Sequence, residues 1–216
     1  MIKIDKTVKP DILKHNFNQW TSEYIKFKSG DPAFTKSTEN KYRHVDIKNA
    51  LIAETKGKCI YCESKVMDIS DGDIEHILPK SKRWDLCFEW ENLTLACRRC
   101  NRAKLDYYDE SQSLINPYID NPKMHFHFAG SLLIALTGRG KVTLDKVDLN
   151  RVDLLESRLR YLERVESITM LIGQQTGELK EILFKDLQGY AKEDKEFSGM
   201  MEAYIEGVKT KLFQVN

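Results

Sequence analysis

The spacing of apolar residues predicts helices in the N-terminal part of the chain. Apolar side chains near helical spacing indicate helices over residues 10–27 and 43–56. Residues 29–40, between these two segments, contain the Gly, Pro, Ser and Asn that are typical of a loop. We therefore expect a helical segment over residues 1–56.

The C-terminal part is also expected to be mostly helical. From Asn150, a plausible N-cap, apolar residues recur every three or four positions along a charged background up to Ile172. Two further helices are expected over residues 178–190 and 194–213. Their apolar stripes indicate helix-to-helix packing, with a face for a partner as the alternative.

Between these helical parts, the pattern changes to one that is typical of strands. Residues 125–136 and 141–145 alternate or cluster apolar side chains, and Gly138-Arg139-Gly140 predicts a turn between two strands. The segment INPYIDNP at 115–122 has two prolines in eight residues and indicates a boundary. We expect an α+β fold with three parts: an N-terminal helical segment (1–56), a core that holds the motifs (57–110), and a mostly helical C-terminal region with a short β-hairpin (111–216).

Charge and composition restrict the possible classes of protein. The formal net charge of the 216 residues is only +1, which excludes a basic coat for nucleic acid and requires any polyanion site to be local. No apolar run approaches the roughly 18 residues needed to span a bilayer, and Met-Ile-Lys-Ile-Asp is not the start of a secretory signal peptide. We therefore expect a cytoplasmic protein without a membrane partner. Thiols stay reduced in that compartment, so the five cysteines favour a metal over disulfides.

Four of the cysteines form two CxxC pairs, Cys59/Cys62 and Cys97/Cys100, with 34 residues between the pairs. Each short gap lets two thiolates reach one tetrahedral zinc ion at about 2.3 Å, and two pairs close the site. Such a closed site is structural, because zinc polarises water only through an open coordination position. Unliganded buried thiols and a redox pair are the alternatives. Cys87 is left over and is most simply a small core residue.

Zinc does not explain the stretch GDIEHILPKS at 72–81, which lies between the two pairs. An acid directly precedes a histidine there, Pro79 follows, and NLTLACRRCNRAK stands at 92–104. The order CIYC, EHILP, NLTLAC and CNRAK resembles the HNH endonuclease superfamily. That resemblance covers about a quarter of the chain and implies a ββα-metal fold, in which one catalytic divalent cation lies between a β-hairpin and a helix.

The resemblance implies a role for each matching residue. His76 would be the general base, and Glu75 a metal ligand on the opposite side of the strand. Asn92 would brace the loop that carries the histidine. Asn101, where many relatives have a second histidine, would be the second metal ligand, and Lys104 would face the phosphate. Because Glu75 and Asn101 offer only oxygen atoms, Mg²⁺ or Mn²⁺ is expected at this site.

Two features stay open. Asp73 is either an acid that supports the metal ligands or a turn residue. Seven basic residues fall within the 25 positions from 80 to 104, where they are either solvated or in contact with phosphate. They are Lys80, Lys82, Arg83, Arg98, Arg99, Arg102 and Lys104.

Longer stretches are similar to a narrower family. Residues 42–66, 72–81 and 139–158 resemble the HNH nuclease subunits of Septu-type anti-phage defence systems, including those attached to retrons. The resemblance implies a metal-dependent nuclease that cuts DNA, with an ATPase partner that controls it and docks on the flanking helices. An RNA endonuclease with the same site is the alternative among enzymes. A zinc-stapled adaptor for nucleic acid or protein, with no catalytic role for His76, is the non-enzymatic alternative.

Overall fold

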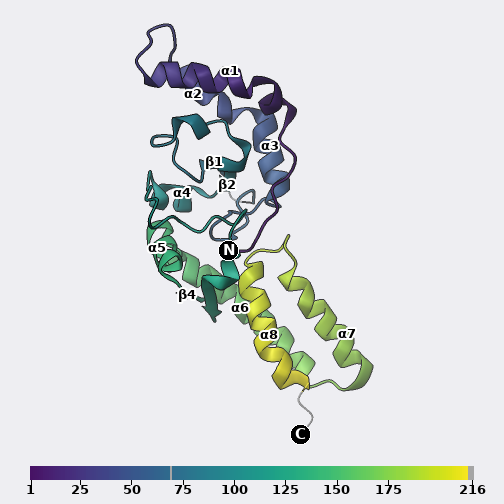
Figure 1. Cartoon of the computed structure of the whole chain (residues 1–216). Helices are drawn as coiled ribbons and strands as arrows, with labels where there is room; N and C mark the ends of the chain where they lie inside the picture. Colours follow the sequence, from purple (N-terminus) through teal and green to yellow (C-terminus); the bar gives the residue numbers. More distant parts are fainter. Residues whose placement is uncertain (69, 214–216) are drawn as a thin grey trace.

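A computed structural model of the chain describes residues 1–68 and 70–213, in which two pairs of short strands interrupt a series of helices. The N-terminal helices lie at one end of the molecule and α6 to α8 at the other, with the first hairpin and α4 between them (Figure 1). In chain order the elements are α1 Asp11–Lys28, α2 Lys36–Asn40, α3 Val45–Glu54, β1 Asp73–His76, β2 Leu93–Ala96, α4 Arg98–Lys104, β3 Phe126–Ala129, β4 Leu132–Ala135, α5 Gly138–Val147, α6 Val152–Gly173, α7 Gly177–Gln188 and α8 Ser198–Phe213.

The two helices predicted in the N-terminal segment are confirmed as α1 and α3. Asp11 lies in the first turn of α1 and Lys26 and Lys28 in its last turn, where each charge is favourable with respect to the helix dipole. The prediction of a loop over residues 29–40 is wrong in part, because the last five of these residues form α2. In the tertiary structure, Glu39 of α2 forms an ion pair with Lys80 at 3.0 Å, a contact that local sequence does not reveal.

The β1–β2 hairpin separates two hydrophobic clusters. Ile74 pairs with Leu95 and His76 with Leu93, so these four side chains share one face, which packs against α1 and α3. Glu75 pairs with Thr94 and Asp73 with Ala96 on the other face. That face is turned toward α4 and the cysteine-containing cluster. The hairpin thus presents acids and His76 on opposite sides, as strand alternation requires.

The second hairpin differs from the one the sequence predicts. Strands β3 and β4 both lie within residues 125–136, and Gly130, with φ of 59°, makes the turn between them. The strand predicted over 141–145 is wrong, since those residues belong to α5. The Gly138–Gly140 segment is the first turn of α5, and Thr137 caps it by accepting a hydrogen bond from Gly140 N at 3.1 Å.

A close approach explains the glycine at position 140. A Cβ atom there would lie 2.4 Å from the carbonyl oxygen of His125, so only glycine lets α5 pack against this backbone. Asn150 is not the cap of α6, whose N-cap is Arg151. The Asn150 side chain instead makes hydrogen bonds with Leu133 N and Leu133 O at 3.0 and 2.8 Å.

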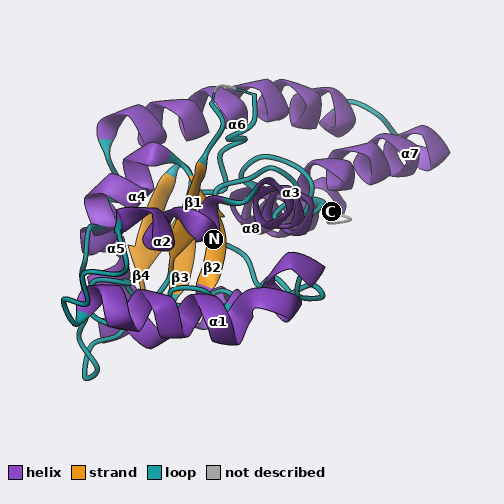
Figure 2. Cartoon of the chain, turned by 90° about the horizontal axis from the view of Figure 1, so that it is seen from above, coloured by secondary structure: helices purple, strands orange, loops and turns teal. Residues whose placement is uncertain are grey.

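Helices α6, α7 and α8 confirm the expected helical C-terminal region. Residues from α6 and α8 join the same hydrophobic cluster as the four paired cysteines, so the core of this region is continuous with the cysteine site. In Figure 2 the strands are short and helices surround them, which confirms the mixed fold with small hairpins. Among the described helices, none combines the length and apolar character needed to cross a membrane.

Candidate active site

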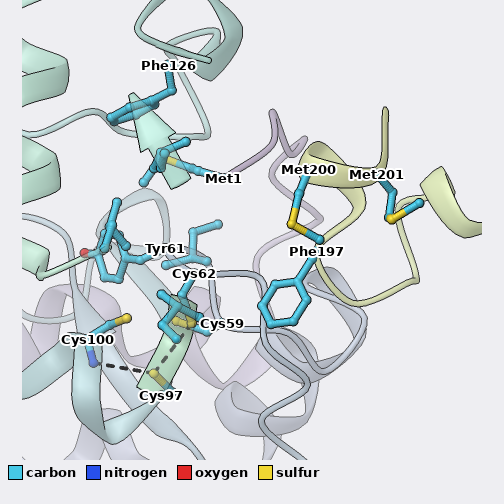
Figure 3. Close-up of a cluster of buried hydrophobic side chains, with 14 of the residues drawn as sticks. Met1, Cys59, Tyr61, Cys62, Cys97, Cys100, Phe126, Phe197, Met200 and Met201 are labelled. Carbon is cyan, nitrogen blue, oxygen red and sulfur yellow. Dashed lines mark hydrogen bonds between the residues drawn. The ribbon is translucent and has the colours of Figure 1, made fainter. Parts of the chain in front are cut away.

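The four paired cysteines meet in one buried cluster. The sulfur atoms of Cys59, Cys62, Cys97 and Cys100 all lie within 4.8 Å of one another, and Cys62 Sγ and Cys97 Sγ are 3.8 Å apart. Figure 3 places them among the apolar side chains of Tyr61 and its neighbours. Four thiols at this spacing suit one tetrahedral ion, and sulfur ligands favour zinc. The cluster therefore supports the structural zinc site that the sequence predicts.

Two arginines of the C-terminal region lie close to these thiols. Arg151 Nη1 donates to Cys100 Sγ at 3.5 Å. Arg158 is 1% exposed, and burial lowers its pKa to about 10, while the nearby Cys62 thiol acts in the opposite direction. The guanidinium therefore stays charged at neutral pH. A zinc ion with four thiolates would carry a net charge of −2, which these two cations would offset. The region after residue 111 is thus coupled to the site electrostatically.

The cysteine cluster also fixes where α4 begins. Cys97 directly follows β2 and caps α4, since its sulfur accepts a hydrogen bond from Cys100 N at 3.4 Å. Because α4 starts at the cluster, its next turn lies over β1. Asn101 and Lys104, three residues apart on one side of this helix, consequently contact the acidic face of β1.

Glu75 and Lys104 form the first of these contacts. Glu75 is 6% exposed, and its Oε1 lies 2.6 Å from Lys104 Nζ, which also donates to the carbonyl oxygen of His76 at 2.9 Å. Oε1 has no partner with hydrogen-bond geometry within the described part of the chain. Burial raises the pKa of the Glu75 carboxyl, and the Lys104 ammonium opposes that rise.

This contact adds a partner that was not expected for Lys104. The lysine is 1% exposed and is paired with Glu75, and its side chain lines the same cavity as His76 and Asn101. Its role beside the phosphate stays a prediction. A buried ammonium needs acceptors on several sides, and Glu75 together with the His76 carbonyl oxygen supplies them.

His76 lies on the other face of β1 and is held from two directions. Its Nε2 is 2.9 Å from the carbonyl oxygen of Cys87, and its ring meets the ring of Tyr42 edge-on at 4.7 Å. A carbonyl oxygen only accepts, so Nε2 carries the proton and Nδ1 keeps its lone pair. Burial lowers the pKa of His76 to about 3, so the imidazole is neutral at physiological pH.

Asn92 connects the two ends of the loop beside His76. Its Oδ1 accepts from Leu78 N at 2.8 Å, and its Nδ2 donates to the carbonyl oxygens of Leu78 and Leu86 at 3.0 and 3.1 Å. Leu78 follows His76 by two residues, and Leu86 precedes Cys87, whose carbonyl oxygen binds the imidazole. This buried amide thus holds both segments that determine where His76 points.

Asn101 forms a hydrogen bond with Asp73, the acid whose role the sequence left open. Its Nδ2 donates to Asp73 Oδ2 at 2.9 Å, and its Oδ1 accepts no hydrogen bond from the described residues. Asp73 and Glu75 are two positions apart on one face of β1, and α4 covers that face through Asn101 and Lys104. The two predicted metal ligands, Glu75 on β1 and Asn101 on α4, therefore lie where this strand and this helix meet.

These side chains line a cavity of about 480 Å³ that opens to the surface. It includes Glu75, His76, Asn101 and Lys104, whereas Asn92 and the four cysteines lie outside it. An adjoining cavity of about 490 Å³ includes Asp73 and shares Asn101 with the first. The structure thus gathers the predicted acid, histidine and second asparagine in one place.

Three further residues at these cavities were not expected from the sequence. Tyr42 and Arg43 line both cavities, and Lys48 lines the second. They come from the N-terminal helical segment, and only the tertiary fold brings them to the site. Of the seven basic residues near the motif, only Lys80 and Lys104 line the first cavity. Lys82 and Arg83 form ion pairs with nearby acids instead.

Comparison with known proteins agrees with this geometry. Residues 59–106 match the family described as HNH endonuclease. The chain is 34% identical over 145 residues to Septu protein PtuB of Bacillus thuringiensis, covering 67% of this chain and 52% of that protein. It is 29% identical over 224 residues to Septu protein PtuB of Bacillus mycoides, covering 85% and 74%.

A third relative has a different name. Septu protein PtuA of Bacillus mycoides is 24% identical over 190 residues, which cover 71% of this chain and 26% of that protein. The chain spans about half the length of the first PtuB relative. It contains an HNH endonuclease domain and is similar to proteins of Septu systems over much of its length.

The cysteine cluster leads to a prediction about stability. We expect Cys97→Ser to lose zinc and to lower the melting temperature markedly, because metal-binding energy is folding energy in such sites. Zinc content and thermal unfolding of purified protein measure both effects. Cys87→Ala is the matched control, since Cys87 is equally buried but lies outside the cluster, and it should retain zinc. An unchanged melting temperature with zinc still bound in Cys97→Ser would contradict the structural role.

Proposed function

We propose that the chain is a metal-dependent endonuclease that hydrolyses phosphodiester bonds of DNA as the effector of an anti-phage defence complex. The observation that carries this proposal is the cavity that joins Glu75, His76 and Asn101, all within the residues that match the HNH endonuclease family. The similarity to Septu protein PtuB supports the defence role.

The residues of the cavity fit a divalent cation of the Mg²⁺ or Mn²⁺ class. Glu75 Oε1 is buried with only the Lys104 ammonium beside it, 2.6 Å away and outside hydrogen-bond geometry, and Asn101 Oδ1 is the free end of its amide. Both atoms are hard oxygen donors, which suit these ions better than a second zinc. A bound cation would offset charge on the phosphorus centre and the leaving oxygen. Lys104 supplies a positive charge beside Glu75 when that carboxylate has no other cation.

His76 is proposed as the general base. With Nε2 donating to the Cys87 carbonyl oxygen, Nδ1 is the nitrogen that can take a proton from an attacking water. The lowered pKa keeps the ring neutral, so that lone pair is present before substrate arrives. Asn92 is proposed as the residue that orients His76, because it ties Leu78 to Leu86 on either side of the imidazole.

DNA is the proposed substrate, and RNA remains the alternative. A neutral histidine and an oxygen-bound cation act on a phosphodiester whether or not a 2′-hydroxyl is present. Arg43 and Lys48 at the adjoining cavities are available to contact phosphate. The adaptor alternative has no need for Glu75, His76 and Asn101 to share a cavity, and their proximity argues against it.

We also propose a division of labour along the chain. Residues 57–110 form the nuclease core, and residues 1–56 cover the face that holds His76. Residues 111–216 would dock an ATPase partner. Exposed apolar side chains on α6 and α7, among them Met170, Leu171 and Ile182, support a protein interface there. The similarity of a PtuA protein to much of this chain supports a partner from the same system.

The metal proposal predicts a second cation site. Titration of zinc-loaded protein with Mn²⁺, followed by calorimetry or electron paramagnetic resonance, should reveal one site weaker than the zinc site. Glu75→Ala and Asn101→Ala should each abolish it, because each removes one of the proposed oxygen ligands. Glu91→Ala removes an exposed acid from the segment between β1 and β2 and should leave Mn²⁺ binding unchanged. Equal binding by all four proteins would refute the site.

The role of His76 predicts a loss of cleavage without a loss of fold. We expect His76→Ala to retain zinc but to cut at a rate lower by on the order of 10²-fold or more. Plasmid DNA and total cellular RNA should be assayed in parallel with Mg²⁺ or Mn²⁺, with and without a co-purifying partner. His15→Ala, on the exposed side of α1, serves as control. If His76→Ala cuts at the wild-type rate, another group is the base.

A further inference from the structure

We propose that Asp73 is a positioning residue of the divalent-metal site: its carboxylate holds the side-chain amide of Asn101 so that Oδ1 remains available to the metal. This inference rests on the proposed nuclease function and extends it to a residue outside the HNH acid–histidine pair. It is carried by the hydrogen bond from Asn101 Nδ2 to Asp73 Oδ2 at 2.9 Å.

The chemistry of an amide gives this bond its consequence. A side-chain amide has one end that donates and one end that accepts, and an ionised carboxylate only accepts. Asp73 therefore selects the donor end of Asn101, and the acceptor end, Oδ1, is left without a hydrogen bond among the described residues. A cation binds the oxygen of an amide and is repelled by its NH₂ group. The orientation that Asp73 selects is thus the one that a metal requires.

The position of Asp73 on β1 makes this arrangement possible. Asp73 and Glu75 share the face of the strand that α4 covers, because side chains two positions apart point the same way. Asn101 contacts the first acid and Lys104, one helical turn later, contacts the second. Helix and strand are therefore joined by two polar contacts, and the Asn101 contact leaves the amide oxygen without a hydrogen bond among the described residues.

The surroundings of Asp73 favour a role in orienting Asn101 over direct binding of the metal by Asp73. The adjoining cavity places Arg43 and Lys48 beside the Asp73 carboxylate, and Asp73 raises the pKa of Arg43 as a minor contributor after Tyr42. One oxygen of Asp73 is already occupied by Asn101. The negative charge of Asp73 is thus balanced by arginine, lysine and the amide, which leaves less need for a cation bound directly to this carboxylate.

The first test measures Mn²⁺ affinity of zinc-loaded protein in three variants. Asp73→Ala removes the acceptor and should weaken binding by about 10- to 100-fold, the usual effect of losing a partner of a metal ligand. Asp73→Asn offers Asn101 both an acceptor oxygen and a donor NH₂ group, so it selects one end of the amide less strictly and should weaken binding by less than Asp73→Ala does. Asp71→Asn is the control, since it removes the same charge from an exposed position on the same loop and should change nothing. Zinc content and melting temperature establish that each variant is folded.

Each departure from this pattern overturns the inference. If Asp73→Asn loses as much affinity as Asp73→Ala, the charge of Asp73 matters and the residue acts as a ligand or counterion. If Asp73→Ala binds Mn²⁺ as well as wild type, Asp73 is not needed to orient the Asn101 amide.

A second readout is independent of any divalent metal. In ¹⁵N-labelled zinc-loaded protein, the side-chain NH₂ signal of Asn101, assigned through Asn101→Ala, should shift in Asp73→Ala and persist nearly unchanged in Asp71→Asn. No shift in Asp73→Ala would remove the hydrogen bond and the inference with it, and would leave the nuclease proposal standing. A shift accompanied by no Mn²⁺ binding in wild type would instead overturn both the metal site and the positioning role.

Discussion

Four thiols meet within 4.8 Å of one another between the two ends of the molecule, and the position of α4 depends on that meeting. Cys97 both contributes a thiol and caps α4, so an ion that joined the cysteines would also set where Asn101 and Lys104 lie over β1. The half-buried Arg151 and the buried Arg158 place positive charge from the C-terminal region beside the same thiols. If this cluster were broken, α4 would no longer be held in place against the β1–β2 hairpin, even with every side chain of the cavity still present.

The hairpin then divides the chemistry between its two faces. His76 faces the cluster formed with α1 and α3, where Tyr42 and the Cys87 carbonyl oxygen fix its ring. Asp73 and Glu75 face α4, where Asn101 and Lys104 meet them. The proposed base and the proposed cation ligand therefore lie on opposite sides of one short strand and line a common cavity. Alternation along a strand keeps the imidazole away from the acid beside it in sequence, which is what separate roles require.

Sequence alone was sufficient where the signal was local. The two CxxC pairs predicted the cysteine cluster, and the acid–histidine step and Asn101 predicted residues that line the cavity. Sequence failed where distant contacts decide the outcome. It did not reveal that Lys104 pairs with the buried Glu75. Gly140 resembles a turn residue, yet it is required by the approach of the His125 carbonyl oxygen. Arg43 reaches the cavity only because α3 packs against the hairpin.

The most direct test of this account is anomalous X-ray scattering at the zinc and manganese absorption edges, from crystals of the His76→Ala protein soaked in Mn²⁺. The account predicts a zinc peak among the four sulfur atoms and a separate manganese peak bound by Glu75 and Asn101. Displacement of Lys104 from Glu75 would accompany the second peak if both cations need the same carboxylate oxygen. Manganese found only at surface acids, with Glu75 still paired to Lys104, would contradict a metal-dependent active site in this cavity.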